Sequence, residues 1–190
     1  YYSFNKTPDG NKLLVRPYEG GFGTFEVRAG EHYIEEIKMQ GSLRSRDTSS
    51  IAVGGKLENG RPIPARSCQL PVGDYRPIYI QVIMGELLLA ISENPYRIDN
   101  QNQVYRNSKY SNSINIRQNQ PFVLDFSAKP QVWFIKPDEN QRIRLGYDLK
   151  VTAVLVNPKL DVVVRRIYDT TQKKQMRYTN SDGQEHTVEV

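Results

Sequence analysis

The sequence predicts an all-β protein built as tandem antiparallel β-sandwiches, with little helix. Two observations carry this prediction. Apolar and β-branched side chains recur with a period of two, as in 149–156 and 161–168, which is typical of strands. These segments return about every 8–12 residues with turn residues between them, which favours a sandwich or barrel over alternating βαβ units.

The expected strands are short and bounded by Gly, Pro, Asn or Asp. In order along the chain they are 12–16, 23–28, 33–39, 51–57, 77–84, 87–92, 113–117, 122–126, 132–135, 143–144, 149–156, 161–168, 175–178 and 186–190. Residues 31–39 also have a weak helical pattern. That stretch is shorter than the roughly 12–15 residues that a marginal helix needs in water.

Three dipeptides predict tight hairpins because Asn, Asp and Gly tolerate positive φ: Asp9-Gly10, Asn59-Gly60 and Asp182-Gly183. Gly85 lies between two apolar runs and predicts a hairpin tip or a bulge.

The segment 92–120 differs from its surroundings because it is rich in Asn, Gln, Ser and Tyr. A long loop without structure is uncommon inside one compact domain. We therefore expect an N-terminal sandwich module at 1–95, a polar linker or long loop at 96–112, and a C-terminal sandwich module at 113–190. The net charge changes at the same place, from zero over residues 1–95 to +5 over residues 96–190.

The composition limits the partners. Lys and Arg exceed Asp and Glu by five over 190 residues, but no dense basic run exists, so nucleic acid is not an expected partner. No apolar stretch approaches the roughly 18 residues of a membrane span. The single cysteine, Cys68, excludes a disulfide within this chain. Because the sequence begins at Tyr1 without an initiator Met, we expect a mature or truncated fragment, from which any signal peptide would already be gone.

Two stretches resemble known secreted modules. The run Leu70-Pro-Val-Gly-Asp-Tyr75 followed by a strand is similar to prealbumin-like and collagen-binding B-type repeats. Residues 138–168 resemble immunoglobulin-like modules of bacterial envelope proteins, without the Cys…Trp…Cys core of antibody domains. This resemblance implies that the C-terminal module at 113–190 is an immunoglobulin-like β-sandwich. Residues 65–75 and 121–126 are also similar to uncharacterised secreted bacterial proteins. The resemblance implies an extracytoplasmic sandwich protein and no particular activity.

No catalytic residue, metal ligand set or cofactor site is expected. Cys68 has only His32 and His186 as bases, and none of the three lies in a motif for nucleophilic catalysis. One Cys and two His are too few for the usual zinc ligand set. The pairs Glu35-Glu36 and Asp138-Glu139 are more simply solvated charges than a glycosidase pair.

Tyrosines interleaved with cations mark the candidate binding residues: Tyr96, Arg97, Tyr105, Arg106 and Tyr110. Flat aromatic side chains beside amides suit a glycan or a peptide, because they give contact area at low entropic cost. They could also stack single-stranded nucleic acid, or simply pack onto the sandwich. Trp133 is expected in the core.

Together these features predict a non-catalytic extracytoplasmic module, secreted, periplasmic or tethered to a bacterial cell envelope, that binds a ligand or serves a structural role. A glycan or an envelope protein is the expected partner. Two alternatives stay open: a carbohydrate-binding accessory domain, and a β-sandwich hydrolase acting on glycans. A row of exposed coplanar tyrosines would favour the first, and two facing carboxylates in a cleft the second.

Overall fold

The computed structural model describes residues 1–30, 36–46, 49–107, 114–137, 142, 144–171, 175–179 and 185–189. These residues form strands joined by turns and loops, and no helix occurs among them, so the all-β prediction is confirmed. Within this part of the chain there is accordingly no helix that could cross a membrane.

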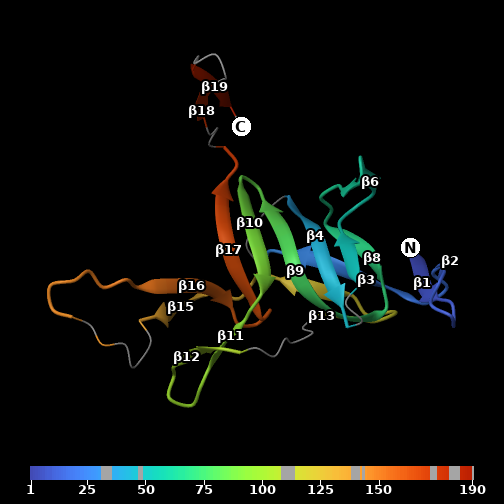
Figure 1. The fold of residues 1–190 in the computed structure, drawn as a ribbon, viewed down its shortest axis with the longest axis horizontal. Coiled ribbons are helices and arrows are strands. Elements are labelled where there is room, and N and C mark those ends of the chain that lie inside the picture. Colours follow the sequence, from blue (N-terminus) through green and yellow to red (C-terminus); the bar gives the residue numbers. More distant parts are fainter. Residues whose placement is uncertain are drawn as a thin grey trace.

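The largest element is an eight-stranded sheet, called the large sheet below (Figure 1). Seven strands lie side by side in the order β15 (Gln131–Lys136), β16 (Thr152–Asn157), β17 (Val162–Asp169), β10 (Leu87–Glu93), β9 (Gly73–Met84), β4 (Ile37–Ser45) and β5 (Ser50–Val53). The eighth, β13 (Ile114–Ile116), pairs with the first residues of β9. Every pair in this sheet is antiparallel.

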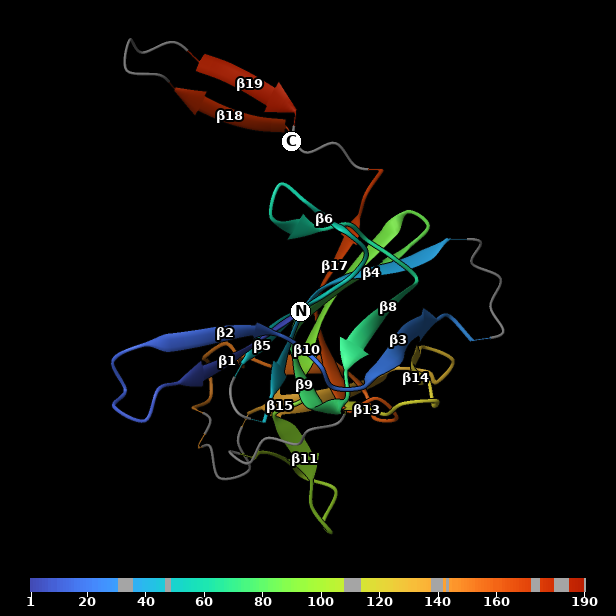
Figure 2. The same ribbon diagram turned by 90° about the vertical axis from the view of Figure 1, so that its right-hand side faces the viewer.

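A second sheet of three strands, the small sheet, has the order β14 (Phe122–Asp125), β3 (Phe22–Arg28) and β8 (Ser67–Pro71). β3 and β8 are antiparallel, whereas β14 runs parallel to β3. Figure 2 shows the two sheets from another side, with the small sheet to the right of β9 and β10.

Four two-stranded hairpins complete the described structure: β1 (Tyr2–Lys6) with β2 (Leu13–Pro17), β6 (Leu57–Glu58) with β7 (Arg61–Pro62), β11 (Tyr96–Ile98) with β12 (Val104–Arg106), and β18 (Gln175–Thr179) with β19 (Glu185–Glu189). The β6–β7 turn is Asn59-Gly60, with φ of 49° and 76°, as the sequence predicts. Gly85, with φ of 55°, lies in the predicted turn between β9 and β10.

The hydrophobic core lies between the two sheets. The small sheet contributes Phe25, Val27, Leu70 and Leu124, all at most 1% exposed. The large sheet contributes buried side chains from six strands, namely Ile37, Met39, Leu43, Val53, Tyr75, Ile80, Val82, Ile91, Ile114, Ile116 and Val162. Burial of apolar area at about 25 cal/mol per Å² is what holds the two layers together.

Strands from both halves of the sequence share these sheets. β17 pairs with β10, and β14 pairs with β3. Two separate sandwich modules are therefore not shown, and the boundary at 96–112 stays a prediction. Of the expected strands, 33–39 is observed from Ile37 onward: Glu36 is not in a strand, and residues 33–35 lie outside the described part. Arg144 is not in a strand, and residue 143 is not described.

A buried tyrosine fixes the corner at which the chain passes from β8 in the small sheet to β9 in the large sheet. The Tyr75 hydroxyl, in a side chain that is 2% exposed, donates a hydrogen bond of 2.7 Å to the carbonyl oxygen of Pro71.

Asp125 makes a second link between the layers. Its carboxylate accepts hydrogen bonds from Lys159 and Ser127, and these lower its pKa to about 2.

We expect the substitution Tyr75→Phe to lower the free energy of unfolding by about 1–2 kcal/mol, because it leaves the buried Pro71 carbonyl without this donor. Urea denaturation measures the change. Tyr147→Phe, at a side chain 70% exposed, is the control and should leave stability unchanged. Equal midpoints for both variants would contradict the role given to the Tyr75 hydroxyl.

Candidate functional site

The sequence-predicted binding residues are brought together in the β11–β12 hairpin, but they do not share one surface. Tyr96 pairs with Arg106, and Arg97 pairs with Tyr105. Directly opposed residues point to the same face of a hairpin and successive residues to opposite faces. The two tyrosines of this hairpin therefore lie on opposite faces and do not form a coplanar row. Tyr110 lies outside the described residues.

Arg97 is part of the framework of this hairpin. Its guanidinium group donates hydrogen bonds of 3.0 Å to both carboxylate oxygens of Asp161, a residue of the turn before β17. It also donates to the backbone carbonyl oxygens of Asn94 and Tyr96. Asn94 is 3% exposed. Its side-chain oxygen accepts a hydrogen bond from the backbone N–H of Tyr96, and its backbone N–H donates to the carbonyl oxygen of Asp161. Bidentate charged hydrogen bonds of this kind fix orientation. Arg97 therefore anchors the hairpin to the large sheet.

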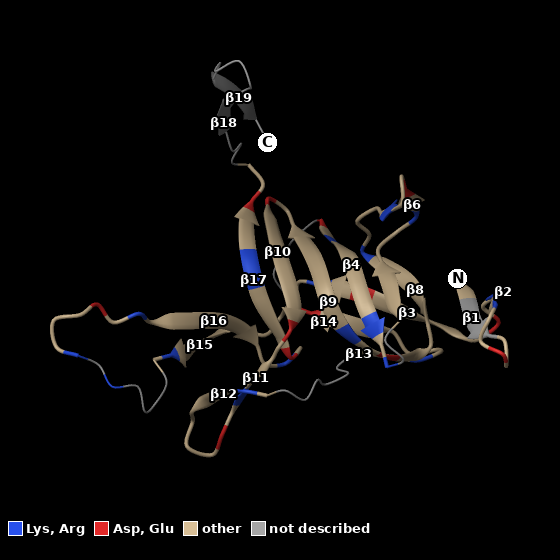
Figure 3. Cartoon of the chain, in the orientation of Figure 1, with Lys and Arg blue, Asp and Glu red and all other residues tan. Residues whose placement is uncertain are grey.

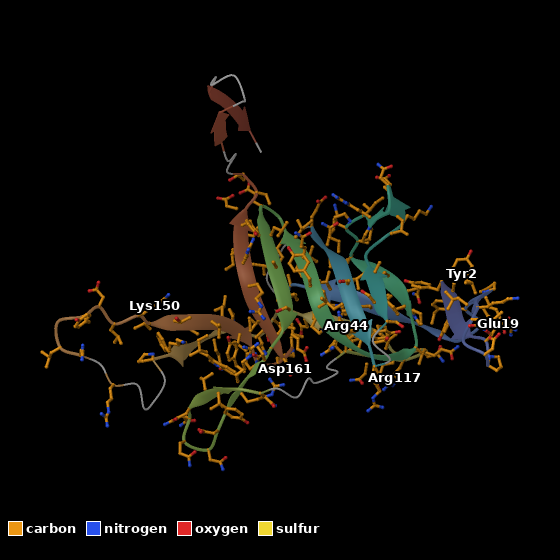
Figure 4. The ribbon with its side chains drawn as sticks, viewed as in Figure 1. Tyr2, Glu19, Arg44, Arg117, Lys150 and Asp161 are labelled. Carbon is orange, nitrogen blue, oxygen red and sulfur yellow. The ribbon has the colours of Figure 1, made fainter. Side chains whose placement is uncertain are left out.

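Beside this hairpin the large sheet carries a cavity of about 250 Å³, which we call the arginine pocket. Five strands and the segment after β10 contribute its lining, which consists of Arg44, Arg76, Pro77, Ile78, Ser92, Glu93, Pro95, Arg106 and Arg165. Figure 3 shows basic positions on β17 and at the lower end of β4, and Figure 4 labels Arg44 there.

The strand pleat explains why Arg44 and Arg76 reach this surface. Their neighbours Leu43 and Tyr75 are buried in the core, so the arginines point to the face of the large sheet that is turned away from the small sheet. Arg44 and Arg76 are also direct cross-strand partners in the β4–β9 pair. Like charges in directly opposed positions destabilise a sheet.

A bulge brings in the third arginine. The register between β10 and β17 shifts after Ala90, which pairs with Arg166, while Ile91 pairs with Val164. Arg165 is thus the extra residue of β17. Its Nε donates a 2.7 Å hydrogen bond to the hydroxyl of Ser92 on β10.

The charges of the pocket do not balance. Among its described lining residues, four guanidinium groups face one carboxylate, that of Glu93. Glu93 lies 3.6 Å from Arg76, and both side chains are largely buried, at 13% and 17% exposure. In the described structure the buried Nε of Arg44 has no hydrogen-bond partner. Because a guanidinium does not lose its proton in proteins, the positive excess persists at any physiological pH.

A second cavity of about 450 Å³, called the Trp133 groove, lies between the same hairpin and β15. Its lining combines apolar and amide side chains, namely Ile98, Asn102, Gln103, Val104, Val132, Trp133, Phe134, Ile135 and Pro137. Trp133 is only half-buried, so the expectation of a core tryptophan is wrong. Its indole Nε1 donates to the side-chain oxygen of Gln131 at 3.0 Å, and the neighbouring Phe134 is 65% exposed.

A larger cavity of about 710 Å³ lies at the β1–β2 hairpin and is lined in part by Tyr1, Tyr2, Tyr18 and Tyr75. The ring of Tyr1 packs on Phe22, its hydroxyl donates to the Gln69 carbonyl, and burial raises its pKa. Charged side chains of one sign do not converge on this cavity as they do on the arginine pocket. We therefore place the candidate site at the arginine pocket.

Of the residues weighed for catalysis, the structure describes the side chains of Cys68 and Glu36. Cys68 on β8 packs partly against the core, and burial raises the pKa of its thiol, which keeps it protonated at neutral pH. Glu36 forms an exposed ion pair with Lys38. His32, Glu35 and the pair 138–139 lie outside the described residues, and His186 belongs to β19. Among the described residues, no three His, Cys, Asp or Glu side chains come together as a metal site would require.

Sequence reasoning missed the arginine pocket, although one of its members, Arg106, was among the predicted residues. Arg44, Arg76 and Arg165 lie in three strands, each beside core residues, and only the register of β4, β9, β10 and β17 brings them together. A basic residue on the polar face of a strand is common, so no one of these arginines gives a signal in the sequence.

Comparison of the chain with protein-family models, with curated proteins and with solved structures gives no match.

We expect Asp161→Asn to lower the free energy of unfolding by about 1 kcal/mol, because Arg97 loses a charged, bidentate acceptor that is partly exposed to solvent. Asn tolerates the positive φ of 52° at this position. Hydrogen exchange should become faster at the amides of β11 and β12. The exposed Asp148→Asn is the control, and identical exchange in the two variants would argue against the anchoring role.

Proposed function

We propose that this chain is a non-catalytic binding module whose arginine pocket receives an anionic group of its ligand. The observation that carries the proposal is the cross-strand pair of Arg44 and Arg76 together with the buried, unpartnered Nε of Arg44. A buried donor without an acceptor costs about 1–3 kcal/mol. The Nε itself is closed off from the cavity, so an anion would be bound by the terminal nitrogens of the guanidinium groups, where it relieves the repulsion between the two arginines.

The chemistry of the pocket suits a sulfate, phosphate or carboxylate group. Guanidinium groups offer planar, forked donors that match the oxygens of such anions. Glu93 and Ser92 each engage one arginine of the pocket and so fix the directions of Arg76 and Arg165. A volume of about 250 Å³ is ample for one such group with several waters, at about 30 Å³ for each water.

The extracytoplasmic location belongs to this proposal as well. It is supported by the resemblance of the Leu70–Tyr75 stretch to secreted modules, and Tyr75 and Pro71 of that stretch form the corner between the two sheets.

The first test is anion binding. Sulfate and phosphate, exchanged for chloride at constant ionic strength, should stabilise the protein against thermal unfolding with a saturable dependence. At an anion concentration ten times the Kd the gain is about 1.4 kcal/mol. Arg44→Met keeps the aliphatic stem but removes the charge, and we expect it to weaken binding at least about tenfold in titration calorimetry.

The control for this test is Arg144→Met, at an exposed arginine outside the pocket. Sulfate also stabilises proteins without binding, through exclusion from their surface. The contribution of exclusion is not saturable, and it should be equal in the wild type, in Arg44→Met and in Arg144→Met. A saturable effect of the same size in Arg44→Met would overturn the assignment of the site.

The second test is stability without ligand. In a buffer of low ionic strength that contains chloride alone, we expect Arg44→Met to be at least as stable as the wild type, with a gain of about 0.5 kcal/mol, because a like-charge pair and an unsatisfied donor are removed. Chemical denaturation measures this. A clear loss of stability would show that Arg44 serves the fold and not a ligand.

A further inference from the structure

The arginine pocket and the Trp133 groove are two parts of one surface. Both are lined by the β11–β12 hairpin, the first by Arg106 and the second by Ile98 and Val104. The register pairs Ile98 with Val104 and Tyr96 with Arg106, so alternation places all four side chains on one face of the hairpin. Arg106 and Val104 are two residues apart, about 7 Å along the strand.

The two parts differ in chemistry. The pocket presents guanidinium groups, whereas the groove is lined by two successive aromatic residues of β15, Trp133 and Phe134, beside Asn102 and Gln103 with their amides. Amide side chains both donate and accept hydrogen bonds. An aromatic surface with a few convergent polar groups is the usual lining of a small-ligand site.

We infer that the ligand is an acidic oligosaccharide. Its sulfate or carboxylate enters the arginine pocket, and a neighbouring sugar ring lies in the Trp133 groove, with its hydroxyls on Asn102 and Gln103. This inference rests on the proposed function and adds to it the class of ligand. A sugar chain carries anionic groups, hydroxyls and ring faces next to one another, which is the combination that the pocket and the groove together offer to bind.

An acidic peptide is the competing ligand, and the position of β12 argues against it. A peptide strand that adds to a sheet needs a free strand edge. β15 is the terminal strand of the large sheet, but its neighbourhood is occupied by β12, which lies close to it and shares the lining of the groove. The gap between them is lined by side chains, which suits a ring better than an added strand.

The test compares four ligands by titration calorimetry: inorganic sulfate, a sulfated galactan hexasaccharide whose only anionic groups are sulfates, a hexamer of galacturonic acid, and a poly-glutamate peptide of similar charge. We expect at least one of the two acidic oligosaccharides to bind about a hundredfold tighter than inorganic sulfate, because linked contacts act together. Which of the two binds more tightly identifies the anionic group as sulfate or carboxylate.

Three variants and a control distinguish the contribution of the groove from that of the pocket. Trp133→Ala should weaken oligosaccharide binding at least about tenfold while leaving the affinity for inorganic sulfate unchanged, and that unchanged affinity also shows that the variant is folded. Gln103→Ala, which removes one amide, should have the same effect to a smaller degree. Arg44→Met should weaken the binding of inorganic sulfate and of the oligosaccharide. Tyr147→Ala, at an exposed ring that lines neither cavity, should leave the affinity for both of these ligands unchanged.

The outcomes separate the two proposals. Sulfate bound through Arg44 with no gain for either oligosaccharide would overturn the glycan inference and leave the anion pocket standing. Poly-glutamate bound more tightly than both oligosaccharides, with dependence on Trp133, would show a peptide site instead. No binding of sulfate or of any other anion would overturn both proposals.

Discussion

The burial of one face of the large sheet is the constraint on which the other features depend. The small sheet covers that face, and Phe25, Leu70 and Leu124 close the core against it. Side chains alternate across a strand, so each residue committed to the core sends its neighbours to the opposite face. Leu43 and Tyr75 thereby place Arg44 and Arg76 side by side. The positive pocket is thus a direct result of how the core is sealed.

Such an arrangement conflicts with the local rules of sheet stability, since opposed like charges and an orphaned donor both cost free energy. Natural proteins retain conflicts of this kind at functional sites and compensate for them elsewhere. Here the compensation is visible: Glu93 contacts Arg76, Ser92 accepts from Arg165, and the two-layer core supplies the stability. Arg44 is the member that these contacts leave unsatisfied.

Much of the local structure could be predicted from the sequence, because strands and tight turns depend on neighbouring residues. The alternation in 77–84 and the Asn59-Gly60 turn are examples. Pairing between distant segments could not be predicted, since the period of two does not say which strand lies beside which. The parallel β3–β14 pair and the bulge at Arg165 are of this kind. Nor could the sequence distinguish Arg97, which Asp161 holds in place, from Arg106, which lines the pocket.

The parallel pair also has a consequence for how the chain is made. Phe25 and Phe122 face one another across β3 and β14, although about 100 positions of sequence separate them. At roughly 5–20 residues per second, a ribosome needs about 5–20 s to deliver the second strand after the first. Until then β3 presents an open edge and the apolar side chains behind it, which is the kind of surface that invites aggregation. We therefore expect the nascent chain to be most prone to aggregation before β14 has emerged from the ribosome.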